Sequence, residues 1–528
     1  MNPFLPRGFL HSAEDKQDRR VTWLWLFIGA ILLPFTIVQT MLPLAGWLAP
    51  IFLLRFAHTA RHAAMALTLI WLAQAISKFV AVRGGEPPDS YAALIGLALY
   101  FLVGGLISTA PYATDRLLGS RLDDKIRILM FPLALVTFDW LLTVLPASNA
   151  GKLTVYSQYD SLSLLQLLSI TGMWGVTFLI GWGASTANFV WERGFDWPPA
   201  RGAAVSFVAV MIAVLLFGSI RLNFAAPSSP TVVAAAVTMD RALFEEAFPT
   251  RLDWATFNTW TEEERAGRRP FFQATIDQML QRSESALRVG AKIVGWQEAS
   301  AAVLEEDKQQ ALDRASDLAK RYDAFMQIWL AVFTRAPTHH YYLNQSILID
   351  NAGRIRATYT KTYPTFPVEA YIGIPGPGKL PIIETPYGRI ATAICNDFHF
   401  PALIRQAGQG DADIVMAPSN DIIPWGQQDA VIHTFRAIEN GYSAVRATGL
   451  GLSMITDYQG RMLGQQHYGD GGGVMLASIP TRGVVTVYSR IGDAFAYLCV
   501  VGLVFLAGWA FVRRTAAPGL QGLGSQKA

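Results

Sequence analysis

The chain has 528 residues, and its 43 Lys and Arg residues against 40 Asp and Glu residues leave a formal net charge of only +3. So small a positive surplus argues against a nucleic-acid-binding protein, and two cysteines are too few for a disulfide scaffold or a cysteine-rich metal site. Charged residues make up 16% and apolar residues 52%, with a mean hydropathy of +0.29, whereas soluble domains carry about 25% charged residues, so part of the chain must lie in lipid.

Seven apolar runs precede residue 225, and an eighth lies near the C-terminus. They lie near 21–40, 41–57, 63–82, 91–111, 127–146, 166–190, 202–222 and 492–512. A helix of about 20 apolar residues crosses a hydrocarbon core about 30 Å thick. The pattern therefore predicts an α-helical membrane bundle of about eight spans. We expect a transmembrane region of about seven helices at 1–225, a C-terminal transmembrane helix at 491–514 and a cytoplasmic tail at 515–528.

Lys and Arg residues in short loops indicate which side of a membrane each loop faces. With the N-terminus inside, fourteen of them lie on the cytoplasmic side and four, namely Lys78, Arg83, Lys152 and Arg221, lie on the other. We therefore expect a multi-pass protein of the bacterial cytoplasmic (inner) membrane with both termini in the cytoplasm. Residues 226–490, after an odd number of spans, would face the periplasm or the cell exterior.

Two ionisable residues lie within the predicted spans, where a charged side chain is costly. Asp139 is in the middle of one span, and pairing of helices or contact with a substrate would each explain it. Lys78 lies near the end of another span. Its long stem would let the ammonium group reach the membrane surface.

Residues 226–490 alternate between strand and helix patterns. Strands are predicted at 231–237, 292–296, 327–333, 341–349, 354–358, 389–394, 414–418, 442–447, 452–456 and 473–478, and helices at 271–289, 303–325, 400–408 and 427–440. This alternation predicts one α/β domain.

Three residues with complementary chemistry each follow a predicted strand: Glu298, Lys361 and Cys395. Strand ends in α/β domains converge on a common crevice. A thiol needs a base to become a nucleophile, a carboxylate in an apolar setting can supply it, and an ammonium can stabilise an oxyanion. Each residue also has a structural explanation, Cys395 as a small core residue and the other two as surface charges. The residues by themselves leave both interpretations open.

The segments around these residues resemble known motifs. Gly295-Trp-Gln-Glu298, Tyr359-Thr-Lys361-Thr-Tyr and Ala393-Ile-Cys395-Asn-Asp are similar to the glutamate, lysine and cysteine motifs of the nitrilase (carbon–nitrogen hydrolase) superfamily. That resemblance implies a four-layer α-β-β-α sandwich and a catalytic triad of Glu298, Lys361 and Cys395, with Glu369 eight residues after the lysine. The arrangement of the chain, with many spans before the domain and one after it, resembles that of the apolipoprotein N-acyltransferase family.

The resemblance implies transfer of a fatty acyl chain from a phospholipid, through a thioester on Cys395, to the N-terminal amine of a diacylglyceryl-cysteine lipoprotein. The implied partners are a phospholipid donor, a lipoprotein or small amine or amide acceptor, and the membrane, with no nucleic acid. No metal or organic cofactor is implied, and His339 and His340 lack further ligands at metal spacing. The expected substrate-binding residues are Asn344, Asn396, Asp397, Asn420 and Trp425.

The chain also departs from that family. Asn396 and Asp397 follow the cysteine where the family usually has Tyr-Glu, and the stretch from Glu369 to Cys395 is short. These differences motivate an alternative, a membrane-anchored amidase with the same triad. A second alternative is an inactive paralogue that acts as a membrane binding or scaffold protein, although an intact Glu-Lys-Cys set with a second glutamate argues against it.

Overall fold

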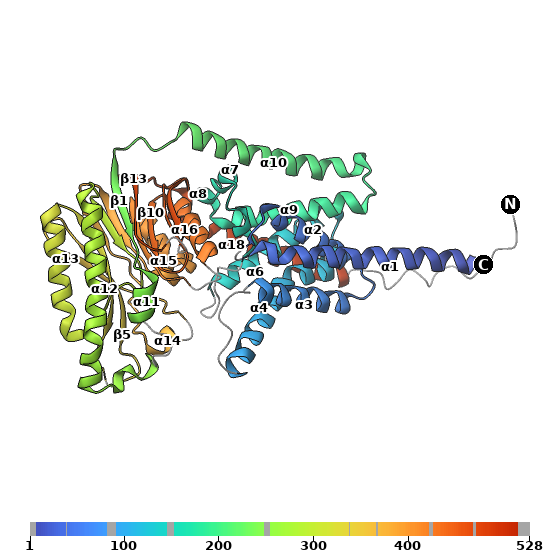
Figure 1. Ribbon diagram of the computed structural model, residues 1–528. Coiled ribbons are helices and arrows are strands. Elements are labelled where there is room, and N and C mark those ends of the chain that lie inside the picture. Colours follow the sequence, from blue (N-terminus) through green and yellow to red (C-terminus); the bar gives the residue numbers. More distant parts are fainter. Residues whose placement is uncertain are drawn as a thin grey trace, which may run out of the picture.

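The computed structural model describes residues 7–37, 40–81, 91–144, 153–247, 254–336, 338–365, 368–421, 426–467 and 471–515. A bundle of long helices lies beside an α/β domain (Figure 1). Trp425, Arg83, Lys152 and the tail from residue 516 onward, which carried predictions from the sequence, lie outside the described residues.

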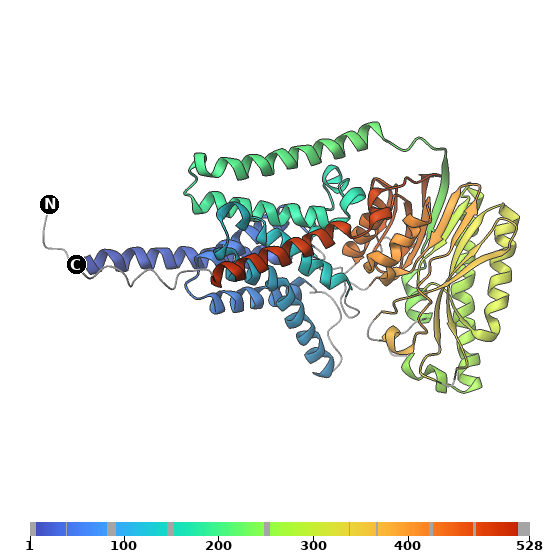
Figure 2. The ribbon, with the colours of Figure 1, turned by 180° about the vertical axis from the view of Figure 1, so that it is seen from behind.

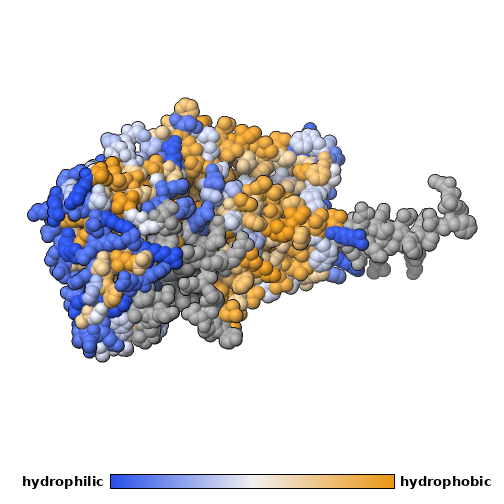
Figure 3. Space-filling view, viewed as in Figure 1, coloured by the Kyte–Doolittle hydropathy of each residue, from blue (hydrophilic) through white to orange (hydrophobic). Residues whose placement is uncertain are grey.

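The bundle is built from helices that are apolar on their exposed side. The long ones are α1 (Arg7–Leu32), α2 (Pro43–Thr59), α3 (Ala63–Ala81), α4 (Tyr91–Leu118), α6 (Met130–Val144), α9 (Met173–Glu192), α10 (Trp197–Phe224) and α18 (Ala494–Thr515), and a short α5 (Asp124–Arg127) precedes α6. On α10, Val208, Ile212 and Leu216 are each more than half exposed. On the face seen in Figure 3, exposed apolar side chains cover much of the bundle. Such a surface is stable in lipid and not in water.

Five described helices are long and apolar enough to cross a membrane. They are Ala63–Ala81, Leu94–Arg121, Asp124–Val144, Trp197–Phe224 and Ala494–Arg513. A bent pair, Leu162–Thr171 and Met173–Glu192, raises the number to six if it is counted as one span. The predicted spans near 21–40 and 41–57 correspond to the apolar end of α1 and to α2, which has 17 residues. Seen from behind, α18 crosses the bundle beside α6 (Figure 2).

The predicted span at 166–190 is broken. Two short helices, α7 (Leu162–Leu165) and α8 (Leu168–Thr171), turn by 118° into α9 at Gly172. Gly172 has a φ of +62°, and a Cβ atom there would lie 2.4 Å from the Tyr488 ring. Tyr488 and Trp174 donate hydrogen bonds to Asp493 at 3.0 and 2.8 Å. The bend therefore makes room for the junction between α17 (Val487–Ile491) and α18.

The α/β domain contains two packed sheets. The first has the order β13-β1-β2-β4-β5-β6, with β3 beside β4, and the second has the order β12-β11-β10-β9-β8-β7. The first is formed by β1 (Thr231–Val237), β2 (Ile293–Trp296), β3 (Ala302–Leu304), β4 (Phe325–Phe333), β5 (Tyr342–Ile349), β6 (Ile355–Thr360) and β13 (Val474–Pro480). The second is formed by β7 (Ile382–Thr385), β8 (Gly388–Thr392), β9 (Ile414–Ser419), β10 (Ser443–Thr448), β11 (Leu452–Thr456) and β12 (Met462–His467).

Helices cover the outer face of each sheet. The first sheet is covered by α12 (Glu262–Arg288) and α13 (Lys308–Tyr322), and α15 (Pro401–Gln409) and α16 (Gly426–Asn440) lie outside the second (Figure 1). Two further short helices are α11 (Arg241–Ala247) and α14 (Val368–Ile372). The four layers are those of the sandwich that the motifs implied.

Alternation along the strands explains why two apolar cores form. Val232, Ala234 and Ala236 of β1 point between the sheets, where they meet Ile414 and Met416 of β9. The intervening residues of β1 and β9 face the helical layers instead. Because successive side chains of a strand point to opposite faces, a strand that is apolar throughout is buried on both sides.

Some element predictions were wrong. The predicted helix at 303–325 begins with strand β3, because residues 302–304 pair with residues 331–333 of β4. Strands β7 and β12 were missed, and both lie at edges of the second sheet. The sequence of β12, Met-Leu-Gly-Gln-Gln-His, lacks the β-branched residues that favour strands. Whether these segments form strands is decided by pairing with a neighbouring strand.

One helix of the domain docks on the bundle. Arg436 and Glu439 of α16 form an ion pair in which both side chains are fully buried. Glu439 accepts a hydrogen bond from the backbone N–H of Met173 at 2.9 Å, and Arg436 donates to the Tyr156 hydroxyl at 2.9 Å. Met173 begins α9 and Tyr156 lies in the turn Thr154–Gln158, η5. The helical layer outside the second sheet is thus tied to the bundle by polar contacts between buried side chains.

We expect Gly172→Ala to lower stability more than Gly194→Ala. Both glycines follow a helix and have a φ near +60°, but a Cβ atom at Gly194 meets nothing within 4 Å. The shared conformational strain costs about 1–3 kcal/mol, and only Gly172→Ala adds a clash with Tyr488. Thermal unfolding of both variants in the same detergent measures the difference, and equal midpoints would contradict the role of the bend.

Candidate active site

The three strand-end residues lie at one end of the packed sheets. Glu298 comes two residues after β2, Lys361 directly follows β6, and Cys395 begins a short 3-10 helix, η8 (Cys395–His399), three residues after β8. The backbone N–H of Glu298 donates to the carbonyl of Ser419, at the end of β9, at 3.2 Å. This bond joins the two sheets where the reactive side chains emerge.

The Lys361 ammonium lies between two carboxylates. Its Nζ atom is 2.8 Å from Glu298 Oε1 and 2.7 Å from Glu369 Oε2, and it also donates to Thr365 Oγ1 at 3.1 Å. The side chain is 2% exposed. Burial alone would lower the pKa of Lys361, but Glu298 and Glu369 raise it well above its usual value. Lys361 is therefore held as an ammonium ion. Such a group can stabilise an oxyanion but cannot act as a base.

Asn344 of β5 connects the two carboxylates. Its Nδ2 atom donates to Glu298 Oε1 and to Glu369 Oε1, both at 2.6 Å. Its Oδ1 atom accepts a hydrogen bond from Trp329 Nε1 at 2.6 Å, which fixes the orientation of the amide. Both N–H groups of the amide are thus used within the protein, and in this structure Asn344 holds the carboxylates in place.

Cys395 occupies a strained backbone position. Its φ is +44°, and such a conformation costs a residue other than glycine about 1–3 kcal/mol. The side chain is half-buried, and its Sγ atom lies 3.9 Å from the backbone carbonyl oxygen of Asn420. Burial and the Glu298 carboxylate raise the pKa of Cys395 well above its usual value, although Lys361 opposes them. The resting group is a thiol that needs a base.

Asp397 and Asn396 connect the loop around Lys361 to the 3-10 helix that begins with Cys395. Asp397 is fully buried. It accepts hydrogen bonds from the Tyr359 hydroxyl at 2.7 Å and from the backbone N–H groups of Tyr363, Ile394 and Thr362 at 2.9, 3.1 and 3.2 Å. Burial raises the pKa of Asp397 to about 7. Asn396 donates to the Tyr363 carbonyl at 3.0 Å. Both side chains therefore hold two loops in register.

The other expected substrate residues differ in position. The Asn420 Oδ1 atom is buried without a hydrogen-bond partner in the described part of the chain, and the backbone carbonyl of the same residue is the one near Cys395. Trp425 is outside that part. His433 is buried and stacks on Phe398 at a ring distance of 3.9 Å. No three His, Cys, Asp or Glu side chains among the described residues are placed to hold a metal ion.

The sequence did not identify three supporting residues. Trp329 orients Asn344, Thr365 accepts from Lys361, and Tyr359 donates to Asp397. Trp329 and Asn344 lie on neighbouring strands, so their contact depends on the register of β4 against β5. Tyr359 lies within the lysine motif itself, but only the folded loop gives its hydroxyl a partner.

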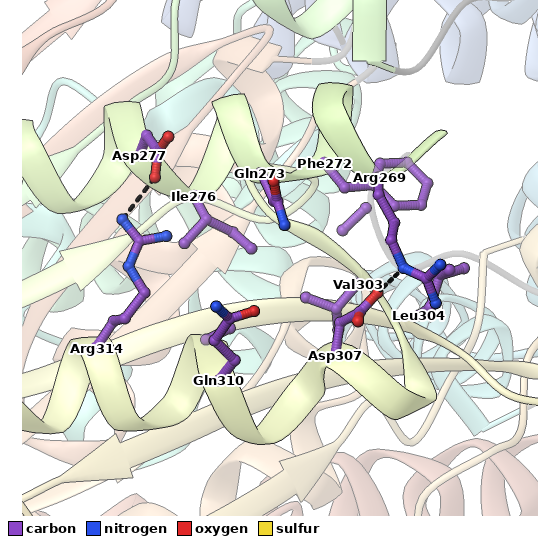
Figure 4. A pocket seen from close by; sticks show the side chains of 12 residues that line it. Arg269, Phe272, Gln273, Ile276, Asp277, Val303, Leu304, Asp307, Gln310 and Arg314 are labelled. Atoms are coloured by element: carbon purple, nitrogen blue, oxygen red, sulfur yellow. Dashed lines mark hydrogen bonds and ion pairs between the residues drawn. The ribbon is translucent and has the colours of Figure 1, made fainter. Parts of the chain in front are cut away.

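A cavity of about 270 Å³ lies elsewhere, between α12 and α13 (Figure 4). Ion pairs lie at two places along it, Arg314 with Asp277 at 2.5 Å and Arg269 with Asp307 at 2.8 Å. None of Glu298, Lys361 and Cys395 lines it. It is therefore separate from the candidate active site.

The four-layer sandwich, the Glu-Lys-Cys set and the apolar bundle define a membrane-bound protein of the nitrilase superfamily. Residues 268–486 match the family model described as Carbon-nitrogen hydrolase, and residues 22–186 match the Apolipoprotein N-acyltransferase N-terminal domain. The chain belongs to the apolipoprotein N-acyltransferase family and is an enzyme of that family.

Three individual proteins show the range of similarity. The chain is 25% identical over 421 residues to an apolipoprotein N-acyltransferase of Geobacter metallireducens, covering 74% of this chain and 75% of that protein. It is 37% identical over 82 residues to a formamidase of Bradyrhizobium diazoefficiens, covering 15% and 24%. An amidase structure from Nesterenkonia sp. aligns with a TM-score of 0.39 and 17% identity, covering 51% of this chain and 96% of that chain.

We expect Asn344→Asp to slow acylation of Cys395 roughly 100-fold, within the range typical of lost catalytic positioning groups. The change removes both donors and places a third carboxylate against Glu298 and Glu369. Asn258→Asp is the matched control, because within the described part of the chain that amide donates to the Thr338 carbonyl alone. The pre-steady-state rate of Cys395 acylation is measured for both variants. Equal rates would show that the bridging amide is dispensable.

We expect Glu298→Gln to make Cys395 more reactive toward iodoacetamide at pH 7–9 while abolishing enzymatic acylation. The Glu298 carboxylate raises the pKa of the thiol and Lys361 lowers it, so a neutral residue at position 298 increases the thiolate fraction at a given pH. Alkylation is followed by mass spectrometry against pH, with Cys395→Ser reporting labelling at Cys499. Slower alkylation in Glu298→Gln would mean that Glu298 is not the charge that suppresses the thiolate.

Proposed function

We propose that this enzyme moves a fatty acyl chain from a membrane phospholipid, through a thioester on Cys395, to the N-terminal amine of a diacylglyceryl-cysteine lipoprotein. The observation that carries the proposal is the buried Glu298–Lys361–Glu369 network, which serves a cysteine on a domain docked against an apolar bundle. Such an arrangement brings acyl-transfer chemistry to substrates that are themselves held in lipid.

In the first half-reaction Glu298 takes the thiol proton and the Cys395 sulfur attacks the ester carbonyl carbon. The oxyanion forms within reach of the Lys361 ammonium, which stabilises it without changing protonation state. When the intermediate collapses, the ester C–O bond breaks and Glu298 returns the proton to the leaving alkoxide. The products are a thioester on Cys395 and a lysophospholipid.

In the second half-reaction the deprotonated acceptor amine attacks the thioester carbonyl. Glu298 takes a proton from the attacking nitrogen, the C–S bond breaks, and the sulfur leaves as a thiol after the proton is transferred back. The product is an amide, and Cys395 returns to its resting form. In this scheme Glu369 and Asn344 position Lys361 and Glu298, and Asn396, Asp397 and Asn420 shape the loops against which the substrates bind.

The proposal includes the membrane arrangement. We place eight spans, six of them the described candidates and two formed by the apolar end of α1 and by α2. With both termini in the cytoplasm, the catalytic domain between residues 226 and 490 faces the outer side of a bacterial inner membrane. The excess of Lys and Arg on one side supports this orientation.

An amidase is the second candidate, supported by the segment similar to a formamidase and by the residues after the nucleophile. In that case water in place of an amine would attack the acyl-enzyme. The same triad would serve, because the acylation step is shared. An inactive scaffold is disfavoured, since a binding protein has no use for a strained cysteine beside a buried ammonium.

We expect wild-type protein mixed with phospholipid vesicles to gain one fatty acyl mass, removable by hydroxylamine, and Cys395→Ser to gain none. Intact-protein mass spectrometry provides the measurement. A diacylglyceryl peptide with a free N-terminus should then accept the acyl chain, whereas its N-acetylated form should not. A folded wild-type protein without an adduct would overturn the proposal. Decay of the adduct to free fatty acid without an amine, or ammonia release from small amides, would favour the amidase.

A further inference from the structure

A small polar cavity of about 30 Å³ lies inside the helical bundle. Its wall includes Gln74, Ser77, Lys78, Tyr112, Asp139 and Thr154. Thr154 belongs to η5, and Tyr156 of the same turn accepts a hydrogen bond from Arg436 of α16. The cavity therefore lies in the half of the bundle next to the catalytic domain.

Five polar side chains in the cavity wall have no hydrogen bond or ion pair within the part of the chain that the structure describes. They are Gln74, Ser77, Lys78, Tyr112 and Asp139, and each is more than nine-tenths buried. Lys78 was expected to extend to the membrane surface, but it is 7% exposed and faces this cavity instead. An ammonium and a carboxylate from different helices thus line one space without touching.

Unpartnered polar groups are expensive in this setting. A buried neutral polar group without a hydrogen bond is strongly disfavoured, and an isolated buried charge is disfavoured far more. Within a membrane no bulk water is available as a substitute partner. The cavity must therefore hold something that bonds to both Lys78 and Asp139.

The size of the cavity selects the occupant. One water molecule needs roughly 10–15 Å³ of such space, so about 30 Å³ accommodates two or so. A phosphate or an ethanolamine head group is too large. The donors of Lys78 and Gln74 and the acceptor oxygens of Asp139 match the two to four partners that a buried water requires.

We propose that Lys78 and Asp139 form an intramembrane ion pair bridged by bound water, which ties α3 to α6. The same waters reach the wall formed by Thr154, and so the pair supports η5, the turn on which α16 docks through Arg436. The assignment does not depend on the acyl donor or acceptor. It assigns Asp139 a role in pairing helices and not in binding a substrate.

A double-mutant cycle tests the pair. We expect Lys78→Met and Asp139→Leu each to lower the unfolding midpoint of the full-length protein in detergent by roughly 5 °C or more, because each leaves a buried charge alone. The double variant Lys78→Met/Asp139→Leu should recover most of the loss. Ile76→Met, on the exposed face of α3, is the matched control and should change nothing. Single variants with an unchanged unfolding midpoint would overturn the pair. A double variant whose midpoint falls by the sum of the two single losses would also overturn it.

Two further measurements test the water. Ser77→Leu keeps both charges but fills part of the cavity that they line, and we expect it to lower the midpoint as the single charge variants do. Infrared spectra of the wild type should show Asp139 as a carboxylate, identified by difference from the double variant Lys78→Met/Asp139→Leu. That variant leaves neither charge unpaired, so the measurement does not depend on the folding of a single variant. A stable Ser77→Leu protein would overturn the role of water, and a protonated Asp139 in the wild type would overturn the ion pair.

Discussion

The candidate active site depends on one interaction, the Lys361 ammonium held between the Glu298 and Glu369 carboxylates in a nearly dry environment. Removing one partner from such a buried charge cluster typically costs about 3–5 kcal/mol, because the remaining charge has no water to solvate it. The three groups come from the ends of β2 and β6 and from α14. The cluster can therefore form only when the first sheet, its register and the loop after Lys361 are all in place.

The same charges also determine what each residue can do chemically. Because the carboxylates hold Lys361 as an ammonium, the lysine cannot act as a base. Burial and the negative charge of Glu298 together raise the pKa of Cys395, so its thiol form is favoured. In the proposed reaction, Glu298 would take the thiol proton. Asn344 and Asp397 hold the surrounding groups in place through hydrogen bonds.

Helix α16 connects this chemistry to the membrane. At one end Arg436 and Glu439 contact Tyr156 and the start of α9 in the bundle. One turn earlier, His433 stacks on Phe398 in the helical turn that begins with Cys395. The turn that begins with Cys395 and the bundle therefore contact the same helix, so packing on α16 fixes where the candidate active site lies relative to the bundle.

The sequence alone indicated the membrane region and the α/β domain, and its motifs singled out Glu298, Lys361, Cys395 and Glu369 as candidate site residues, because apolar runs and short motifs are local properties. It did not reveal that residues 302–304 form a strand, that Gly172 breaks a span, or that Lys78 turns inward. Nor did it show that Asn344 is oriented by Trp329. Each of these depends on contacts between segments far apart in the chain. Strand register and helix packing, which place such segments side by side, are decided only when the whole protein has folded.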